Sequence, residues 1–233
     1  MAFIDKVRLG NGDVVRPVDW SSTPYWSTVE IDDGNIETLK AFGYGIGGDV
    51  PGSPGPRKST KLDTNLKGDG GVIQEQNELL LHTIQIECMQ TVTDPALLFS
   101  SAEFQPDAPF VSGPNMKRLQ RDVMVELRIA NTKSYCEQPL GFFPAGAGVN
   151  PVLGAATRNT GPGVPFIIGQ NGGGSVYNNR QFATPHHIGA GEAFAINLKF
   201  PWGQVRNLNL GTDPNARVRV RIYAAGYRAR PVA

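Results

Sequence analysis

The residues of this chain best suited to bind a metal ion are three histidines and a glutamate, His82, His186, His187 and Glu192. Imidazole nitrogens and carboxylates are common ligands of zinc. Two histidines on one strand share a face only when one residue separates them, so His186 and His187 would point to opposite faces. His82 belongs to a distant segment. The spacing therefore favours a turn leading into a strand over a metal site, and we expect no metal and no cofactor.

Other catalytic motifs are missing from the sequence. It has no G-x-S-x-G motif, and the glycine-rich stretches at 45–48 and 161–163 lack the lysine and the strand-to-helix setting of a phosphate-binding loop. Carboxylates are scattered, and Asp32-Asp33 lies in a segment typical of a turn. We therefore expect no catalytic residues and a chain that is not an enzyme.

Five arginines near the C-terminus form the most notable charged group: Arg217, Arg219, Arg221, Arg228 and Arg230. The first three alternate with apolar residues and would line one face of a strand. They could contact phosphates of nucleic acid or lipid headgroups. They could equally form the solvent-exposed face of an edge strand, where charge discourages unwanted pairing. The chain's net charge of +1 favours the second interpretation.

Three aromatic residues, Trp20, Tyr25 and Trp26, lie among serines and threonines near the N-terminus. Such a group either contacts a neighbouring subunit or covers the domain's own core. The sequence does not decide between these alternatives.

Four segments alternate apolar and polar residues with a period of two, which is typical of antiparallel strands with one buried face. In the first of them Leu80, Ile84, Ile86 and Cys88 share a face. The last carries Val218, Val220 and Ile222 inward and the arginines outward. These strands are predicted at 77–90, 121–129, 192–200 and 217–224, with weaker candidates at 96–100, 140–143, 164–168 and 175–183.

Glycine and proline make up 46 of the 233 residues and favour turns and long loops over helices. Only 94–101 and 115–121 fit a helical turn or two. The stretch 43–71 is rich in turn-forming residues and has little hydrophobic periodicity, so we expect residues 1–75 to form an extended arm and 76–233 the folded domain. The longest later loop is expected at 144–174. Several strands without alternating helices predict an all-β, antiparallel β-sandwich.

Composition supports a folded chain, since 40% of its residues are hydrophobic. Cys88 and Cys136 are expected to be free and buried. Neither a signal-peptide h-region nor a membrane-spanning apolar run is evident, so we expect synthesis in a reducing cytoplasm.

The order of a Gly/Pro-rich arm, long-looped strands, a strand introduced by a polar turn (187–198) and a final strand (218–223) resembles jelly-roll coat proteins of icosahedral viruses. The closest resemblance is to capsid proteins of tailless phages that enclose an internal membrane. It covers about residues 77–230 and implies a single jelly roll and a structural virion protein that assembles into an icosahedral shell. The implied partners are further copies and other capsid proteins, with nucleic acid or an internal membrane beneath and no small-molecule substrate. The implied location is the virion.

Two other classes remain open. A carbohydrate-binding or adhesin-like module would use Trp20, Tyr25, Trp26 and Trp202, because aromatic rings stack on sugars. A cupin-like metal enzyme would use the three histidines and Glu192.

Overall fold

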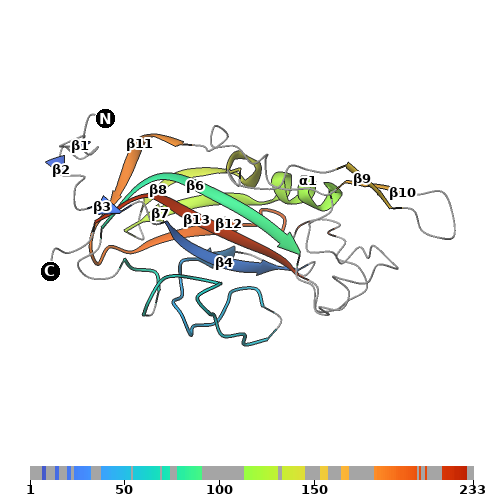
Figure 1. Ribbon diagram of the computed structural model, residues 1–233, viewed down its shortest axis with the longest axis horizontal. Coiled ribbons are helices and arrows are strands. Elements are labelled where there is room, and N and C mark those ends of the chain that lie inside the picture. Colours follow the sequence, from blue (N-terminus) through green and yellow to red (C-terminus); the bar gives the residue numbers. More distant parts are fainter. Residues whose placement is uncertain are drawn as a thin grey trace.

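The structure is a computed structural model, shown in Figure 1. The residues that it describes are 7–8, 14–15, 20–21, 24–32, 38–53, 55–68, 70–73, 78–90, 113–130, 133–144, 153–156, 164–167, 181–203, 205, 208 and 217–229. All statements below concern these residues.

The first sheet is antiparallel and is centred on two long strands, β6 and β13. Its order is β11, β6, β13 and β4, and the short strand β3 continues along the same edge of β13 as β4. The sheet is therefore four strands wide. Its strands are β3 (Trp20–Ser21), β4 (Tyr25–Ile31), β6 (Glu78–Gln90), β11 (Gln181–Ile188) and β13 (Val218–Ala229).

The second sheet is also antiparallel and has the order β5, β12, β7 and β8. Its central strands, β7 and β12, pair along their whole lengths. The strands are β5 (Thr38–Ala41), β7 (Met124–Ile129), β8 (Lys133–Pro139) and β12 (Phe194–Lys199).

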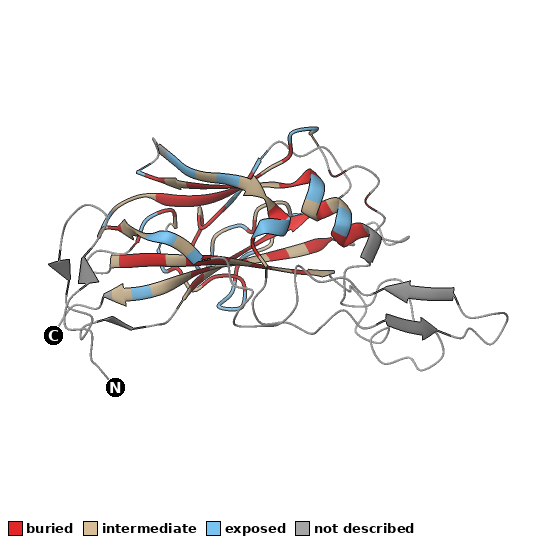
Figure 2. Cartoon of the chain, turned by 90° about the horizontal axis from the view of Figure 1, so that it is seen from above, coloured by how far each residue is buried: buried red, intermediate tan, exposed pale blue. Residues whose placement is uncertain are grey.

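The two sheets pack against each other around one hydrophobic core, and Figure 2 shows buried residues along the strands of both. Burial of such side chains is the main force that holds sheets together, at about 1.5–3 kcal/mol for each large aliphatic or aromatic residue. The predicted all-β antiparallel sandwich is confirmed. Inward side chains include Val218, Val220 and Ile222 of β13, Val125, Leu127 and Ile129 of β7, and Phe194, Ile196 and Leu198 of β12.

The smaller elements lie outside the two sheets. Helix α1 (Gly113–Asp122) buries Met116 and Leu119 in the core, which confirms the helix expected at 115–121. No helix in the described part of the chain is long and apolar enough to cross a membrane. The remaining elements are β1 (Val7–Arg8), β2 (Val14–Val15), the 3-10 helix η3 (Leu140–Phe142), β9 (Leu153–Ala156) and β10 (Val164–Ile167).

The four strongly predicted strands are confirmed as β6, β7, β12 and β13. Among the weaker candidates, 164–168 is confirmed as β10 and 175–183 overlaps the start of β11. The strand predicted at 140–143 is wrong, because these residues form η3. The predictions at 94–101 and 96–100 lie outside the described residues.

One detail of β6 differs from the predicted alternation. Leu79 and Leu81 belong to the core, whereas Leu80 is buried but lies outside the core cluster. The pairing of β6 with β13 shifts register between Leu81 and Thr83, so His82 is an extra residue that reverses which side chains face inward. The two backbones approach closely here, because a Cβ at Gly226 would lie 1.9 Å from the carbonyl oxygen of Leu80. Only glycine fits opposite this bulge.

The predicted division between an arm (1–75) and a folded domain (76–233) needs correction. Strands β4 and β5 precede residue 75, and they pair with β13 and β12 of the two sheets. Residues 42–53 and 55–68, which we call the covering segment, then pack beside β4, where Figure 1 shows them below this strand. Residues 70–73 instead hydrogen-bond to Phe42 and to residues 191–194 at the start of β12.

The glycines of the covering segment allow close packing of backbones. A Cβ at Gly52, whose φ is +79°, would lie 1.7 Å from the carbonyl oxygen of Glu30. The abundance of glycine that predicted a loose arm therefore reflects a segment fitted tightly against β4.

Candidate functional site

The outer face of β13 carries Arg219 and Arg221, and Arg217 directly precedes the strand. Arg217 and Arg219 pair with carboxylates. Arg217 is largely buried and lies 3.5 Å from Asp32. Arg219 Nη2 lies 3.3 Å from Glu30 Oε1 on the neighbouring strand. Both guanidinium groups thus bind acids of the chain's own β4 region.

The other two described arginines also make contacts within the chain. Arg221 Nη2 donates a hydrogen bond of 3.0 Å to the carbonyl oxygen of Leu62 in the covering segment. The guanidinium carbon of Arg228 lies 4.8 Å from the centre of the Tyr25 ring, which is a cation–π contact. Arg230 lies outside the described residues. The alternating arginines therefore help to fix the covering segment and β4.

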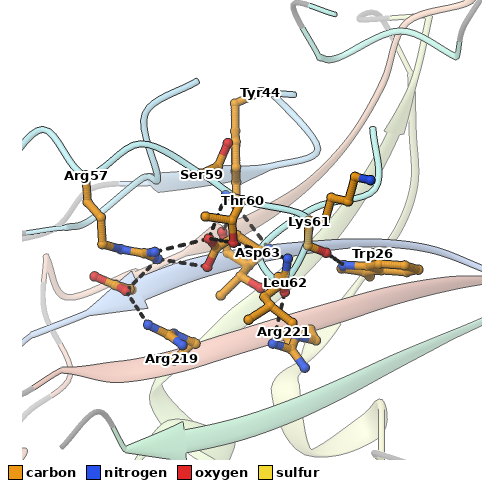
Figure 3. Close-up of polar contacts among 12 residues, drawn as sticks. Trp26, Tyr44, Arg57, Ser59, Thr60, Lys61, Leu62, Asp63, Arg219 and Arg221 are labelled. Carbon is orange, nitrogen blue, oxygen red and sulfur yellow. Dashed lines mark hydrogen bonds and ion pairs between the residues drawn. The ribbon is translucent and has the colours of Figure 1, made fainter. Parts of the chain in front are cut away.

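An ion cluster joins the covering segment to the sheet (Figure 3). Arg57 donates two hydrogen bonds to Asp63, of 2.9 and 3.1 Å, and a third of 2.9 Å to Glu30. The same Glu30 oxygen accepts the bond from Arg219. The side chains of Glu30 and Asp63 are only 4% and 3% exposed, so the guanidinium groups are their main compensating charges in place of water.

The electrostatics favour the charged forms of Asp63 and Arg57. Burial raises the pKa of Asp63, but hydrogen bonds from Arg57 and Thr60 outweigh it and leave the pKa below its ordinary value. Burial acts to lower the pKa of Arg57, and its bonds to Asp63 and Glu30 reverse this and raise it. The two groups stabilise each other as an ion pair.

The turn at 60–63 is held from several sides. Asp63 accepts hydrogen bonds from the backbone and hydroxyl of Thr60, at 2.9 and 3.1 Å. Trp26 Nε1 donates to the carbonyl oxygen of Lys61 at 3.3 Å, beside the bond from Arg221 to Leu62. Figure 3 shows these groups meeting over β4 and β13. The turn is a docked part of the fold.

The free edge of β4 is closed by the covering segment. The amide of Trp26 donates to Asn65 Oδ1 at 2.9 Å, and the amide of Asn65 donates back to the Trp26 carbonyl at 3.4 Å. Asn65 Nδ2 also donates to the carbonyl of Pro24 at 2.9 Å. Further along, the amide of Glu30 donates to the carbonyl of Pro51 at 2.9 Å.

Between these points the phenol of Tyr44 hydrogen-bonds to the backbone of Thr28. Its oxygen accepts a hydrogen bond of 3.1 Å from the amide of Thr28, and its hydroxyl donates to the carbonyl of the same residue. Burial raises the pKa of Tyr44, partly offset by hydrogen bonds with Ser27 and Thr28, so the phenol stays protonated at neutral pH. One side chain thus satisfies both backbone groups of Thr28 at an edge that would otherwise invite another strand.

The predicted aromatic group does not form one exposed surface. Tyr25 faces inward and is 3% exposed, so it belongs to the core. Trp26 lies on the outer face of β4 and is partly buried. Trp20 is in β3, pairing with Ala229. Trp202, in the turn after β12, is 50% exposed.

His186 and His187 point to opposite faces of β11, as their adjacency predicted. The ring of His186 packs edge-on against Tyr135 and Phe182, with centroid distances of 5.0 and 4.8 Å. His187 Nε2 lies 3.0 Å from Glu78 Oε2. Burial lowers the pKa of His186. The two histidine rings therefore contact different parts of the chain and do not converge on one point.

The other two members of the histidine and glutamate set have separate roles. Glu192 Oε2 accepts a hydrogen bond of 2.8 Å from the amide of Gly189 and closes the turn before β12. The ring of His82 packs edge-on against Tyr227. Within the described ranges, no group of three or more histidine, cysteine, aspartate or glutamate side chains is arranged to hold a metal ion.

Neither Cys88 nor Cys136 forms a disulfide, as predicted. Cys88 lies in the core, where burial raises the pKa of its thiol to about 12. Cys136 is only partly buried, so the expectation that both are buried holds for one of them.

The residues that close the β4 edge, Tyr44, Arg57, Asp63 and Asn65, were not singled out from the sequence. They belong to a stretch without hydrophobic periodicity, which conceals their contacts. One local signal exists, since Thr60-x-x-Asp63 has the spacing at which a hydroxyl and a carboxylate brace a turn. The chain shows no significant match to a protein-family model, to a curated protein or to a solved structure.

Proposed function

We propose that the sandwich is a single jelly roll and that the chain is a structural virion protein, a capsid subunit that assembles alone or with other coat proteins into an icosahedral shell. The observation that carries the proposal is the order in which the strands pair. It is independent of the sequence resemblance, because it depends on hydrogen-bonded registers.

The eight strands of the two sheets follow the chain as β4, β5, β6, β7, β8, β11, β12 and β13. The first pairs with the last, the second with the seventh, the third with the sixth and the fourth with the fifth. Pairing of the third with the last and of the fourth with the seventh completes the sheets. This order supports the proposal, because a long antiparallel hairpin rolled into two layers, the form of a jelly roll, would pair its strands in the same way.

The strand registers also support a role in packing against neighbouring subunits. They bring the ends of β4, β6, β8 and β12 to the same end of the sandwich, near Ile31, Gln90, Pro139 and Lys199. Connections that leave one end of a rigid sandwich can contact neighbours without disturbing the core. The segment 144–174, which was predicted as one long loop, contains the antiparallel pair of strands β9 and β10. We propose this segment as a contact element.

The proposal is tested by sedimentation velocity and negative-stain electron microscopy of the purified protein, over a range of concentration, pH and salt. Shells or regular lattices are expected, either from the protein alone or after co-expression with coat proteins of the same operon. A dispersed monomer under every condition, with no co-expressed protein able to recruit it, would contradict the proposal.

One observation favours a second candidate, a carbohydrate-binding module. Trp202 is 50% exposed, and jelly rolls also occur in lectins. Glycan-array binding that is lost in Trp202→Ala and kept in Trp26→Ala would favour this function. Binding lost in Trp26→Ala alone would point to the surface over β4 instead.

A further inference from the structure

The free edge of β4 is occupied by groups that take the place of a neighbouring strand. In antiparallel pairing the residues of a strand alternate between its two neighbours. Trp26, Thr28 and Glu30 direct their backbone groups away from β13. Their partners are the side chain and amide of Asn65, the phenol of Tyr44 and the carbonyl of Pro51. Apart from an isolated β-bridge between Thr64 and Ser27, the covering segment therefore satisfies this edge without pairing as a strand.

The side chain of Thr28 is among the buried polar groups near this edge that lack a hydrogen-bond partner in the described residues, with Tyr25 of the same strand. The hydroxyl oxygen of Thr28 is buried and has no hydrogen-bond partner among the described residues. Thr28 itself is 0% exposed. A buried hydroxyl without a partner is unfavourable, so the closed edge is complete for the backbone of Thr28 but not for its side chain.

We propose that β4 is the edge at which a second copy of this chain pairs, antiparallel and about a two-fold axis at Thr28, when the covering segment is displaced. Such an interface is self-complementary, as two-fold contacts between identical subunits must be. Thr28 would face Thr28 of the second copy, and Trp26 of each copy would face Glu30 of the other. These three pairs each exchange two backbone bonds, so about six bonds replace those now made by the covering segment.

The same register supplies the missing partner of Thr28. Threonines directly opposite each other on paired strands hydrogen-bond through their hydroxyls. The pairing thus satisfies a group that the covered edge leaves unsatisfied. In this arrangement the covering segment, held by Arg57 and Asp63, keeps the subunit from pairing until it is displaced.

This inference deepens the proposed assembly function and rests on it for its biological meaning. The β4 pairing can be tested separately from the assembly function, because it specifies one strand, one register and one residue on the two-fold axis. Other edge contacts, such as those of β8 or β11, would give different pairs.

The experiment uses disulfide trapping in the full chain with Cys136→Ser, which leaves only the buried Cys88. Thr28→Cys is combined with Tyr44→Phe and Asn65→Ala, which remove the side chains that close the edge. Under mild oxidation a disulfide dimer is expected to form about tenfold faster than with Tyr44 and Asn65 intact, because the lost hydrogen bonds favour opening.

Leu62→Cys in the same background is the matched control. Leu62 is 74% exposed and lies in the turn over β4, so random collisions would link this position more readily than the buried Thr28. Trp26→Cys mixed with Glu30→Cys should link, whereas either alone should not. Equal or faster linking through Leu62→Cys would overturn the proposed register.

A second measurement covers the case in which the uncovered variant does not fold. Thr28→Cys with the covering segment intact is oxidised for days at high concentration, so that rare openings are trapped. Absence of a Thr28 disulfide here overturns the inference. Particles seen by electron microscopy without this disulfide would support the proposed assembly function and contradict the β4 pairing. The disulfide without particles would support the β4 pairing and contradict the assembly function.

Discussion

Tyr44→Phe tests the closed edge of β4 with the loss of a single oxygen. In the structure this hydroxyl accepts from the amide of Thr28 and donates to its carbonyl. Phenylalanine keeps the ring and its packing, so the change isolates the hydrogen bonds. Both backbone groups of Thr28 would then be buried without a partner.

The magnitude follows from those two groups. Each buried backbone group left unpaired costs about 1–3 kcal/mol, so the free energy of unfolding should fall by about 2–6 kcal/mol. For a domain of this size each kcal/mol lowers the midpoint of thermal unfolding by about 2–4 °C, so the midpoint should fall by about 4–24 °C. Urea denaturation followed by circular dichroism gives the free energy, and hydrogen exchange at the Thr28 amide reports whether the edge opens locally.

Tyr227→Phe is the control, because Tyr227 is an exposed tyrosine of the same sheet. It should change the free energy of unfolding by less than about 0.5 kcal/mol. If Tyr44→Phe were equally neutral and left exchange at Thr28 unchanged, the phenol would not close this edge.

Gly226→Ala should destabilise the fold by about 1–3 kcal/mol in urea denaturation, because its Cβ would lie 1.9 Å from the Leu80 carbonyl oxygen, while Gly55→Ala, with nothing within 4 Å, should be neutral. The pKa of Asp63 is lowered in the folded chain, so its ionised form stabilises the fold above its ordinary pKa of 3.8, and this stabilisation is lost as the pH falls through the folded value. Asp63→Asn should therefore be less stable than the wild type at pH 7 and should lose less stability between about pH 5 and pH 3; a wild-type pH profile unchanged by the substitution would refute this. Iodoacetamide at pH 8 should modify Cys136 and spare Cys88, whose pKa is about 12, and mass spectrometry showing equal modification would contradict the burial of Cys88.

The strands that could be predicted are those with one uniformly apolar face. Val218, Val220 and Ile222 alternate with arginines, and the same rhythm marks β7 and β12. In β4 the inward positions include Ser27 and the outward ones include Trp26, so the alternation is blurred. Strand β5 has only four residues, and β8 is largely polar, as edge strands often are.

The contacts of the covering segment could not be predicted for a different reason. They join residues far apart in the sequence, such as Thr28 with Tyr44 and Trp26 with Asn65. Such contacts follow from tertiary packing and leave no local period. The glycines that suggested a loose arm, among them Gly52, are positions where backbones meet too closely for a side chain.

For the histidines, sequence spacing alone was sufficient to predict the direction of the side chains. Adjacent residues on a strand must face opposite ways, and His186 and His187 do so, toward Tyr135 and toward Glu78. For the arginines, spacing was not sufficient to predict the contacts. Their outward direction on β13 followed from alternation, but their partners Glu30 and Leu62 depend on the fold.

Electron cryo-microscopy of particles from the native source tests the proposed assembly function most directly. A closed shell is expected, in which this eight-stranded sandwich fits the density of a repeated subunit, with β4 close to a neighbouring copy. Particles whose shell contains no copy of this chain, or a chain found only as a dispersed monomer, would contradict it.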